Sequence, residues 1–184
     1  MNILGNMSQP MSVLTSHKSV EWCTPRDWVD LFRIILGGTI NLDPASCNYA
    51  QSYIQADEYW TEGGLEKEWR AGTVFCNPPY GKTGLGSNQG LWAQKMWNEY
   101  DKGHFHQGIL LINSTHGYNW YEWLWREVPV CLLRGRMRFV RSNGTVGGQA
   151  KRGQTIAYFG PSPPTEFSRI LRPYGRVILP DPEN

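Results

Sequence analysis

The 184-residue sequence lacks the features that mark several protein classes. Its four cysteines, Cys23, Cys47, Cys76 and Cys131, lie far apart and form no CxxC pair. A zinc site and a disulfide scaffold are therefore disfavoured, and reduced thiols in a cytoplasm fit better. The four histidines show no metal-ligand spacing, and no apolar run approaches the ~18 residues of a membrane span. We expect a cytoplasmic protein without a metal.

We also expect no secretory signal, because residues 1–20 carry one lysine and no cleavage-like run after an apolar core. We expect these residues to be a mobile leader. The remaining residues, 21–184, are long enough to bury a core and predict a single domain.

Net charge is small, at +2, but basic residues are concentrated in one segment. Between positions 134 and 152 there is no acidic residue, and the basic residues are Arg134, Arg136, Arg138, Arg141, Lys151 and Arg152. Such an excess can attract phosphates, although a solvated face would explain it equally well.

Segments typical of strands and helices alternate along the chain, which predicts a doubly wound α/β fold. A helix is expected to start with Thr24 as N-cap and Pro25 as its first residue. Apolar runs predict strands at 39–43, 72–76, 108–114 and 129–133. Residues 136–141 are expected to pair with 154–160 across the Asn143-Gly144 turn. The prediction is a mainly parallel central sheet with a terminal antiparallel strand pair.

The tetrapeptide from Asn77 to Tyr80 follows one of these apolar runs, and its two prolines end regular structure. An exocyclic amine of a nucleobase is a poor nucleophile and needs acceptors that hold its N–H groups. The Asn77 side-chain oxygen and the Pro78 carbonyl could be those acceptors, stiffened by the prolines. Tyr80 offers a flat face for an extruded base. The alternative is that the tetrapeptide only ends a strand.

The order of several blocks resembles the phage-type family of DNA N6-adenine methyltransferases, which use S-adenosylmethionine. The resemblance spans roughly Trp22 to Ile178 and is carried by "EWCTP", "NLDPAS", "YWTEGGLEKEW", "VFCNPPYG", "GILLINS" and "RGRMRFV…QTIAYFG". It implies a Rossmann-like methyltransferase fold, S-adenosylmethionine as cofactor and N6-methyladenine in DNA as product. It also implies base flipping, direct transfer without a metal, a phage or prophage origin and hence the host cell cytoplasm.

The resemblance also implies roles for individual residues. The catalytic loop would be Asn77, Pro78, Pro79 and Tyr80. Residues near the methionine part of the cofactor would be Thr24, Pro25, Asp43, Pro44 and Ala45, although a helix cap alone also explains Thr24 and Pro25. Asp57 or Glu58 could hold ribose hydroxyls or be ordinary surface acids. Arg141, Lys151 and Arg152 suit contacts with DNA phosphates.

Other functions remain open from the residues alone. Cytosine N4 or a protein glutamine presents a similar planar amine. No glycine follows Asp43-Pro44, which leaves a binding protein of the same fold without activity as another alternative. Because little chain remains for a target-recognition domain, we expect double-stranded DNA to be bound with low sequence specificity or by a homodimer.

Overall fold

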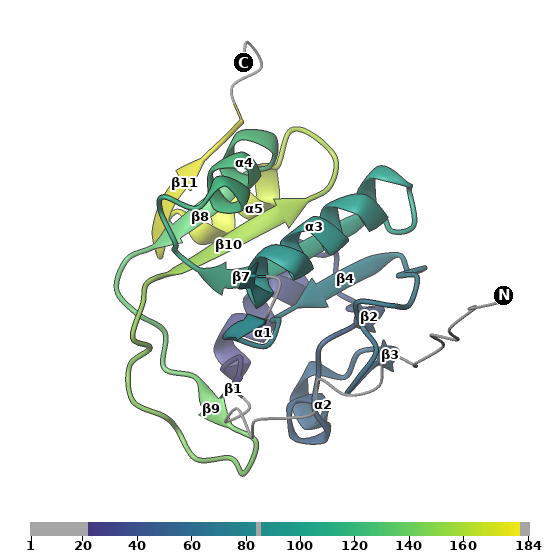
Figure 1. The fold of residues 1–184 in the computed structure, drawn as a ribbon, viewed down its shortest axis with the longest axis vertical. Coiled ribbons are helices and arrows are strands. Elements are labelled where there is room, and N and C mark those ends of the chain that lie inside the picture. Colours follow the sequence, from purple (N-terminus) through teal and green to yellow (C-terminus); the bar gives the residue numbers. More distant parts are fainter. Residues whose placement is uncertain (1–21, 84–85, 181–184) are drawn as a thin grey trace, which may run out of the picture.

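The computed structural model describes residues 22–83 and 86–180, and the predicted leader of residues 1–20 lies outside these ranges. The described chain is an α/β fold around a seven-stranded sheet (Figure 1). Its strands are β2 (Leu42–Asp43), β3 (Glu58–Tyr59), β4 (Thr73–Cys76), β7 (Gln107–Asn113), β8 (Val130–Leu133), β10 (Gln154–Phe159) and β11 (Gly175–Ile178). Their order across the sheet is β11-β8-β10-β7-β4-β2-β3.

The sheet is mixed rather than mainly parallel. Strands β3, β2, β4 and β7 run parallel to one another, whereas β10 is antiparallel to both β7 and β8, and β11 is antiparallel to β8. The parallel part contains β2 and β4, the strands that lead into residues 44–47 and 77–80. The antiparallel part continues the sheet to its other edge.

The predicted pairing of residues 136–141 with 154–160 is wrong. Strand β10 is buried along its whole length and has partners on both sides, so it lies inside the sheet. Strand β9 (Val140–Arg141) pairs instead with β1 (Trp22–Cys23) in a separate two-stranded antiparallel sheet. A half-exposed segment fits such an edge better than the middle of a sheet.

Another two-stranded antiparallel sheet pairs β5 (Lys82–Thr83) with β6 (Gly86–Ser87).

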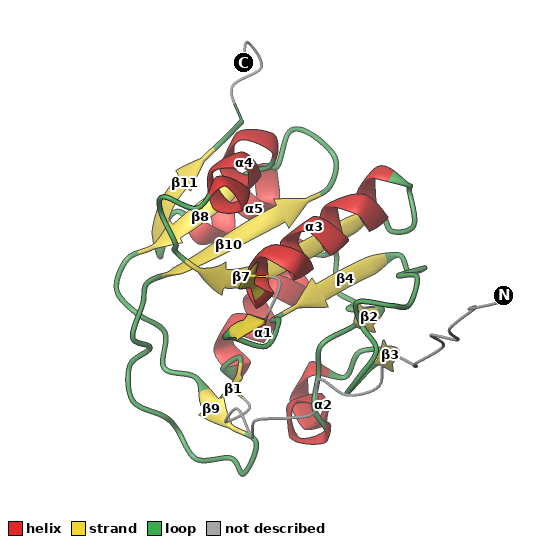
Figure 2. Ribbon diagram, viewed as in Figure 1, coloured by secondary structure: helices red, strands yellow, loops and turns green. Residues whose placement is uncertain are grey.

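Helices cover both faces of the sheet (Figure 2). They are α1 (Arg26–Ile35), α2 (Asn48–Ile54), α3 (Asn88–Asp101), α4 (Asn119–Glu127) and α5 (Thr165–Leu171). Ile109 and Leu111 of β7 join the core with α1 and α5, and Leu110 and Ile112 join the core with α3 and α4. Because successive side chains of a strand point to opposite faces, a continuous apolar run is needed there. Among the described helices, none has the length and apolar character to span a membrane.

Candidate active site

The chain reverses its direction of travel across the sheet between β2 and β4. From β2 it passes through α2 to β3 at the edge, and from β4 it passes through α3 to β7 on the other side. Neighbouring carboxyl ends at such a switch point open a crevice where ligands commonly bind. A cavity of about 460 Å³ lies at this position, a volume typical of small-molecule sites.

The cavity gathers segments that are distant in sequence. Its walls include residues from 22–24, 43–47, 61–64 and 77–80. Most residues predicted for cofactor binding or catalysis line it, namely Thr24, Asp43, Pro44, Ala45, Asn77, Pro78, Pro79 and Tyr80. Pro25 is the exception, because it serves as the N-cap of α1.

Asp43 ends β2 and is only 2% exposed. Its carboxylate accepts hydrogen bonds from the Ala45 backbone N–H (3.3 Å) and from Gln51 Nε2 (3.1 Å). Burial raises its pKa to about 7, because these bonds and one from Ser46 only partly compensate for the loss of water. The side chain therefore lies near its ionisation point at neutral pH, as functional carboxylates often do.

Thr24 has a buried hydroxyl in the same cavity, with an exposed fraction of 1%. Within the described part of the chain, this hydroxyl has no hydrogen-bond partner. The predicted N-cap role of Thr24 is wrong by one position, since the Pro25 carbonyl accepts the first helical bonds, from Trp28 (3.0 Å) and Val29 (3.2 Å). An unpaired buried hydroxyl costs about 1–3 kcal/mol, which a ligand that bonds to it would recover.

The loop after β4 holds its amide in a fixed orientation. Asn77 Nδ2 donates to the Trp22 carbonyl (2.9 Å), and Asn77 Oδ1 accepts from the Tyr80 hydroxyl (3.1 Å). An amide oxygen has two lone pairs, so one remains for another donor. In the described structure, the Pro78 carbonyl accepts no hydrogen bond, although Pro78 is buried in the cavity wall. Two acceptors from one rigid loop are thus available together.

Tyr80 has a second role that the sequence did not reveal. Burial raises the pKa of its hydroxyl, so the hydroxyl stays protonated and donates to Asn77. Its ring packs edge-on against Phe139, with 5.7 Å between ring centroids. The ring therefore lies in a fixed position while its hydroxyl orients the amide.

Tyr80 and Trp22 also line a second cavity, of about 340 Å³. Its other lining residues include Asn113 at the end of β7, Phe139 and residues 148–152. Lys151 and Arg152, predicted to contact phosphates, belong to this group. Arg141 does not line it and instead lies over the Trp22 ring, with 5.7 Å between the guanidinium carbon and the ring centroid.

Asn113 and Phe139 were missed by the sequence reasoning. Asn113 could have been found from its position, because it ends the next parallel strand at the same edge of the sheet as Asp43 and Asn77. Phe139 carries no comparable signal, since its place depends on how a long connection folds back.

The acids proposed for ribose binding do not line either cavity. Asp57 accepts a hydrogen bond from Asn41 Nδ2 (2.6 Å), and Glu58 accepts one from Trp60 Nε1 (2.7 Å). Both are exposed, which fits the alternative of ordinary surface acids. Glu62, from the segment 61–64, is the acid that lines the first cavity beside Asp43.

Within the segment 61–64, Gly64 is buried and packed tightly in the cavity wall. A Cβ atom added to Gly64 would lie 2.1 Å from the Pro44 carbonyl oxygen and 2.5 Å from the Trp92 ring. The carbonyl of Gly64 accepts a hydrogen bond from the indole N–H of Trp69 (2.7 Å), which is fully buried. A glycine is therefore required here for close approach.

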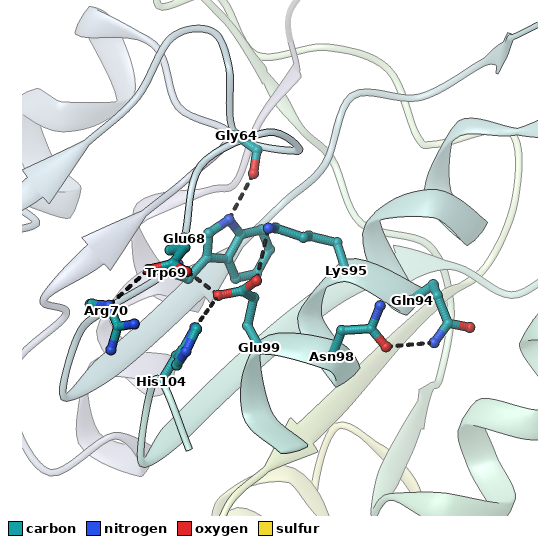
Figure 3. Close-up of polar contacts among 9 residues, drawn as sticks. All are labelled: Gly64, Glu68, Trp69, Arg70, Gln94, Lys95, Asn98, Glu99 and His104. Carbon is teal, nitrogen blue, oxygen red and sulfur yellow. Dashed lines mark hydrogen bonds and ion pairs between the residues drawn. The ribbon is translucent and has the colours of Figure 1, made fainter. Parts of the chain in front are cut away.

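Trp69 is anchored in turn by Glu99 of α3 (Figure 3). Glu99 accepts hydrogen bonds from the Trp69 backbone N–H (2.8 Å), Lys95 Nζ (2.8 Å) and His104 Nδ1 (2.7 Å). Burial opposes ionisation of this carboxyl, but the three bonds outweigh it and lower its pKa to about 2. These bonds hold Trp69 in place, and Trp69 in turn holds Gly64 in the cavity wall.

In the ranges 22–83 and 86–180, no group of His, Cys, Asp and Glu side chains is placed to hold a metal ion. Comparisons with models of protein families, with curated proteins and with solved structures found no match.

Proposed function

We propose that this protein transfers a methyl group from S-adenosylmethionine to the N6 amine of adenine in double-stranded DNA, on a Rossmann-like methyltransferase fold. One observation carries the proposal. A single cavity at the β2–β4 switch point is lined by Thr24, by residues 43–45 and by residues 77–80. These are the blocks to which the resemblance assigns cofactor binding and catalysis, and they lie up to 56 positions apart along the chain (80 minus 24).

The first cavity suits the charged end of the cofactor. S-adenosylmethionine would supply a methyl group on a positively charged sulfur. The carboxyls of Asp43 and Glu62 complement cationic groups, and the Thr24 hydroxyl offers an unused hydrogen bond. The hydrogen bonds to Asp43 compensate only in part for its burial, and the Thr24 hydroxyl has no partner among the described residues. Both groups fit a site in which a polar ligand supplies the missing interactions.

The loop of residues 77–80 suits the acceptor amine. The Asn77 amide is held by its Nδ2, which donates to the Trp22 carbonyl, and by its Oδ1, which accepts from the Tyr80 hydroxyl. One lone pair of Oδ1 remains for an N–H group, and the Pro78 carbonyl offers a second acceptor. Holding both N–H groups positions the nitrogen lone pair for attack, and rigid placement matters because small misplacements cost rate steeply. The loop positions the amine and needs no change of its own charge.

The second cavity suits the extruded base. It shares Trp22 and Tyr80 with the first cavity. The methyl donor in the first cavity and the target base in the second would therefore both contact these two residues. Its aromatic walls can contact a base, and Lys151 and Arg152 can contact the flanking phosphate.

The test is transfer of labelled methyl groups to mixed-sequence duplex DNA, followed by nucleoside analysis. We expect labelled N6-methyladenine, and a loss of about 100-fold or more with Asn77→Ala, by analogy with removal of a transition-state hydrogen-bonding group. Asn98→Ala, which removes an exposed amide of α3 paired with Gln94, is the matched control.

Duplexes of only A·T or only G·C pairs, and a protein mixture, separate the candidate acceptors. Label that enters protein or cytosine but never adenine would overturn the proposal. Undiminished transfer by the Asn77→Ala variant would remove this amide from the mechanism.

A further inference from the structure

A series of exposed arginines extends from the neighbourhood of the second cavity to the far edge of the sheet. We call it the arginine ridge; its residues are Arg134, Arg136, Arg138, Arg141, Arg172 and Arg176. Met137 and Phe139, which alternate with Arg136 and Arg138 along the chain, are each only 5% exposed. This alternation places Arg136 and Arg138 on the outer side of one extended segment.

Hydrogen bonds hold this segment in its extended form. The Met137 carbonyl accepts from Ala150 (2.9 Å), and the Phe139 carbonyl accepts from Gly147 (2.8 Å). The Met137 N–H donates to the Gln154 side chain (2.7 Å). Figure 1 shows the connection from β8 to β9 running along one side of the molecule, beside the returning connection to β10.

The distal end of the ridge is a groove lined by residues of the paired strands β8 and β11 and of the segments next to them, which we call the β8–β11 groove. Its volume is about 770 Å³, and its lining residues are Leu132, Arg134, Arg172, Gly175, Arg176 and Val177. Three of these six are arginines and none is acidic. The Arg134 backbone N–H donates to the Tyr174 carbonyl (2.8 Å), which fixes the start of the connection against the turn between α5 and β11.

The charges of the ridge are not neutralised within the described chain. None of its six guanidinium groups forms an ion pair with a described residue, whereas Arg33, Arg70 and Arg169 pair with Asp30, Glu68 and Glu166. The ridge arginines therefore repel one another without compensation, a pattern that favours a polyanionic partner.

We propose that the arginine ridge binds the phosphate backbone of the duplex that flanks the target adenine, with the β8–β11 groove as the distal contact. Arg136, Arg138 and Arg141 lie on the extended segment, whose five steps span roughly 16 Å at about 3.3 Å per residue. That length matches about five base pairs of B-DNA at roughly 3.4 Å each. Arg134 precedes the bend at Gly135, which has a φ of 84°, and belongs to the distal contact. The assignment rests on the proposed function for the place of the adenine.

The test uses a variant of the distal groove, Arg134→Gln with Arg172→Gln and Arg176→Gln, which leaves both cavities intact. The matched control is Arg169→Gln, an exposed arginine of α5 whose partner is Glu166. Binding of a 30-base-pair duplex is measured by fluorescence anisotropy at increasing salt. Circular dichroism confirms that each variant is folded.

Each lost phosphate contact should reduce the slope of log affinity against log salt by about 0.9, so the groove variant should lose roughly 2.7. The control should keep the wild-type slope. Arg136→Gln with Arg138→Gln should lose about two contacts. A slope equal to that of the wild type in both ridge variants would overturn the proposal, as would absence of duplex binding by the wild type.

Methyl transfer is measured on the same DNA, so the two proposals can fail separately. Transfer by the wild type together with unchanged slopes in the ridge variants contradicts the ridge alone. If the slope of log affinity against log salt falls in the ridge variants but the wild type transfers no label, the ridge is supported as a duplex-binding surface and the proposed activity is contradicted.

Discussion

Asp43 and Glu99 are buried to the same extent, each 2% exposed, yet their pKa values are shifted in opposite directions. Burial disfavours the charged form of both side chains. Glu99 overcomes this with bonds from Lys95, His104 and the Trp69 backbone, which lower its pKa to about 2. Asp43 has only neutral partners, and its pKa rises to about 7. The two pKa values therefore differ because the two carboxyls have different hydrogen-bonding and charged partners, and not because they differ in burial.

The two regions are connected, and the connection assigns them different roles. Glu99 holds Trp69, Trp69 holds the Gly64 carbonyl, and Gly64 packs against the carbonyl of Pro44, the neighbour of Asp43. A fully satisfied cluster thus supports the wall of a cavity in which polar groups still lack partners. The first arrangement is typical of structural stabilisation and the second of a ligand site.

Removing Glu99 should have the largest effect on stability. Glu99→Ala leaves the buried Trp69 N–H unpaired and Lys95 without its counter-charge, so the free energy of unfolding should fall by about 3–5 kcal/mol. Asp43→Asn removes an uncompensated charge and should leave the free energy of unfolding unchanged or increase it. Urea denaturation at pH 7 measures both. Equal losses in the two variants would contradict the distinction between the two carboxyls.

The two carboxyls should also give opposite dependences of stability on pH. Asp43 keeps its proton in the folded state above its ordinary pKa of 3.8, so stability falls as pH rises from about 4 through 7. The change amounts to about 4 kcal/mol, at about 1.4 kcal/mol for each unit of pKa shift. Glu99 stabilises the fold above its ordinary pKa of 4.5, and that contribution is lost as pH falls towards 2.

Denaturation of the wild type and of Asp43→Asn across pH 4 to 8 measures the first slope. The variant should show a flatter profile in this window. A wild-type profile that does not differ from that of the variant would mean that Asp43 ionises normally.

The affinity for the cofactor should also depend on the ionisation of Asp43, with a smaller change in free energy than that of unfolding. A cationic ligand favours the charged form of Asp43, so affinity for S-adenosylmethionine should rise about tenfold between pH 6 and 8, or about 1.4 kcal/mol, with release of a proton. Titrations in buffers of different ionisation enthalpy measure that release. Asp43→Asn should bind without this dependence; a variant that retains it would place the titrating group elsewhere.

Thr24→Val should have the smallest effect on the protein itself. The hydroxyl has no partner among the described residues, so replacing it with a methyl group should change the free energy of unfolding by less than about 1 kcal/mol. Affinity for the cofactor should nevertheless fall severalfold, as the loss of one neutral hydrogen bond predicts. A fall in stability with unchanged affinity would assign Thr24 to the fold rather than to the site.

Individual strands could be predicted from the sequence, because the pattern of apolar residues along a short segment determines them. The continuous apolar run of β7 and the strand that ends just before Asn77 were recognised, and the resemblance named Asp43 and Asn77 as site residues, which line one cavity at the carboxyl ends of neighbouring strands. The pairing of β10 was missed, because an alternating pattern identifies a strand but not its partner. Pairing depends on contacts between residues distant in sequence.

The details of the cavity could be predicted less well. Glu62 was overlooked in favour of Asp57 and Glu58, because spacing in a loop does not give the direction of a side chain. The hydrogen bond from Tyr80 to Asn77 depends on the backbone path through two prolines. Such features follow from tertiary packing and carry no signature in a single sequence.

The most direct test of the central claim is a calorimetric titration of the folded wild-type protein with S-adenosylmethionine. The cavity at the β2–β4 switch point predicts saturable binding at a single site with micromolar affinity. Gly64→Ala, whose added Cβ would displace the Pro44 carbonyl from the cavity wall, should weaken that binding. Absence of binding by the folded wild type up to millimolar cofactor would contradict the assignment of this cavity.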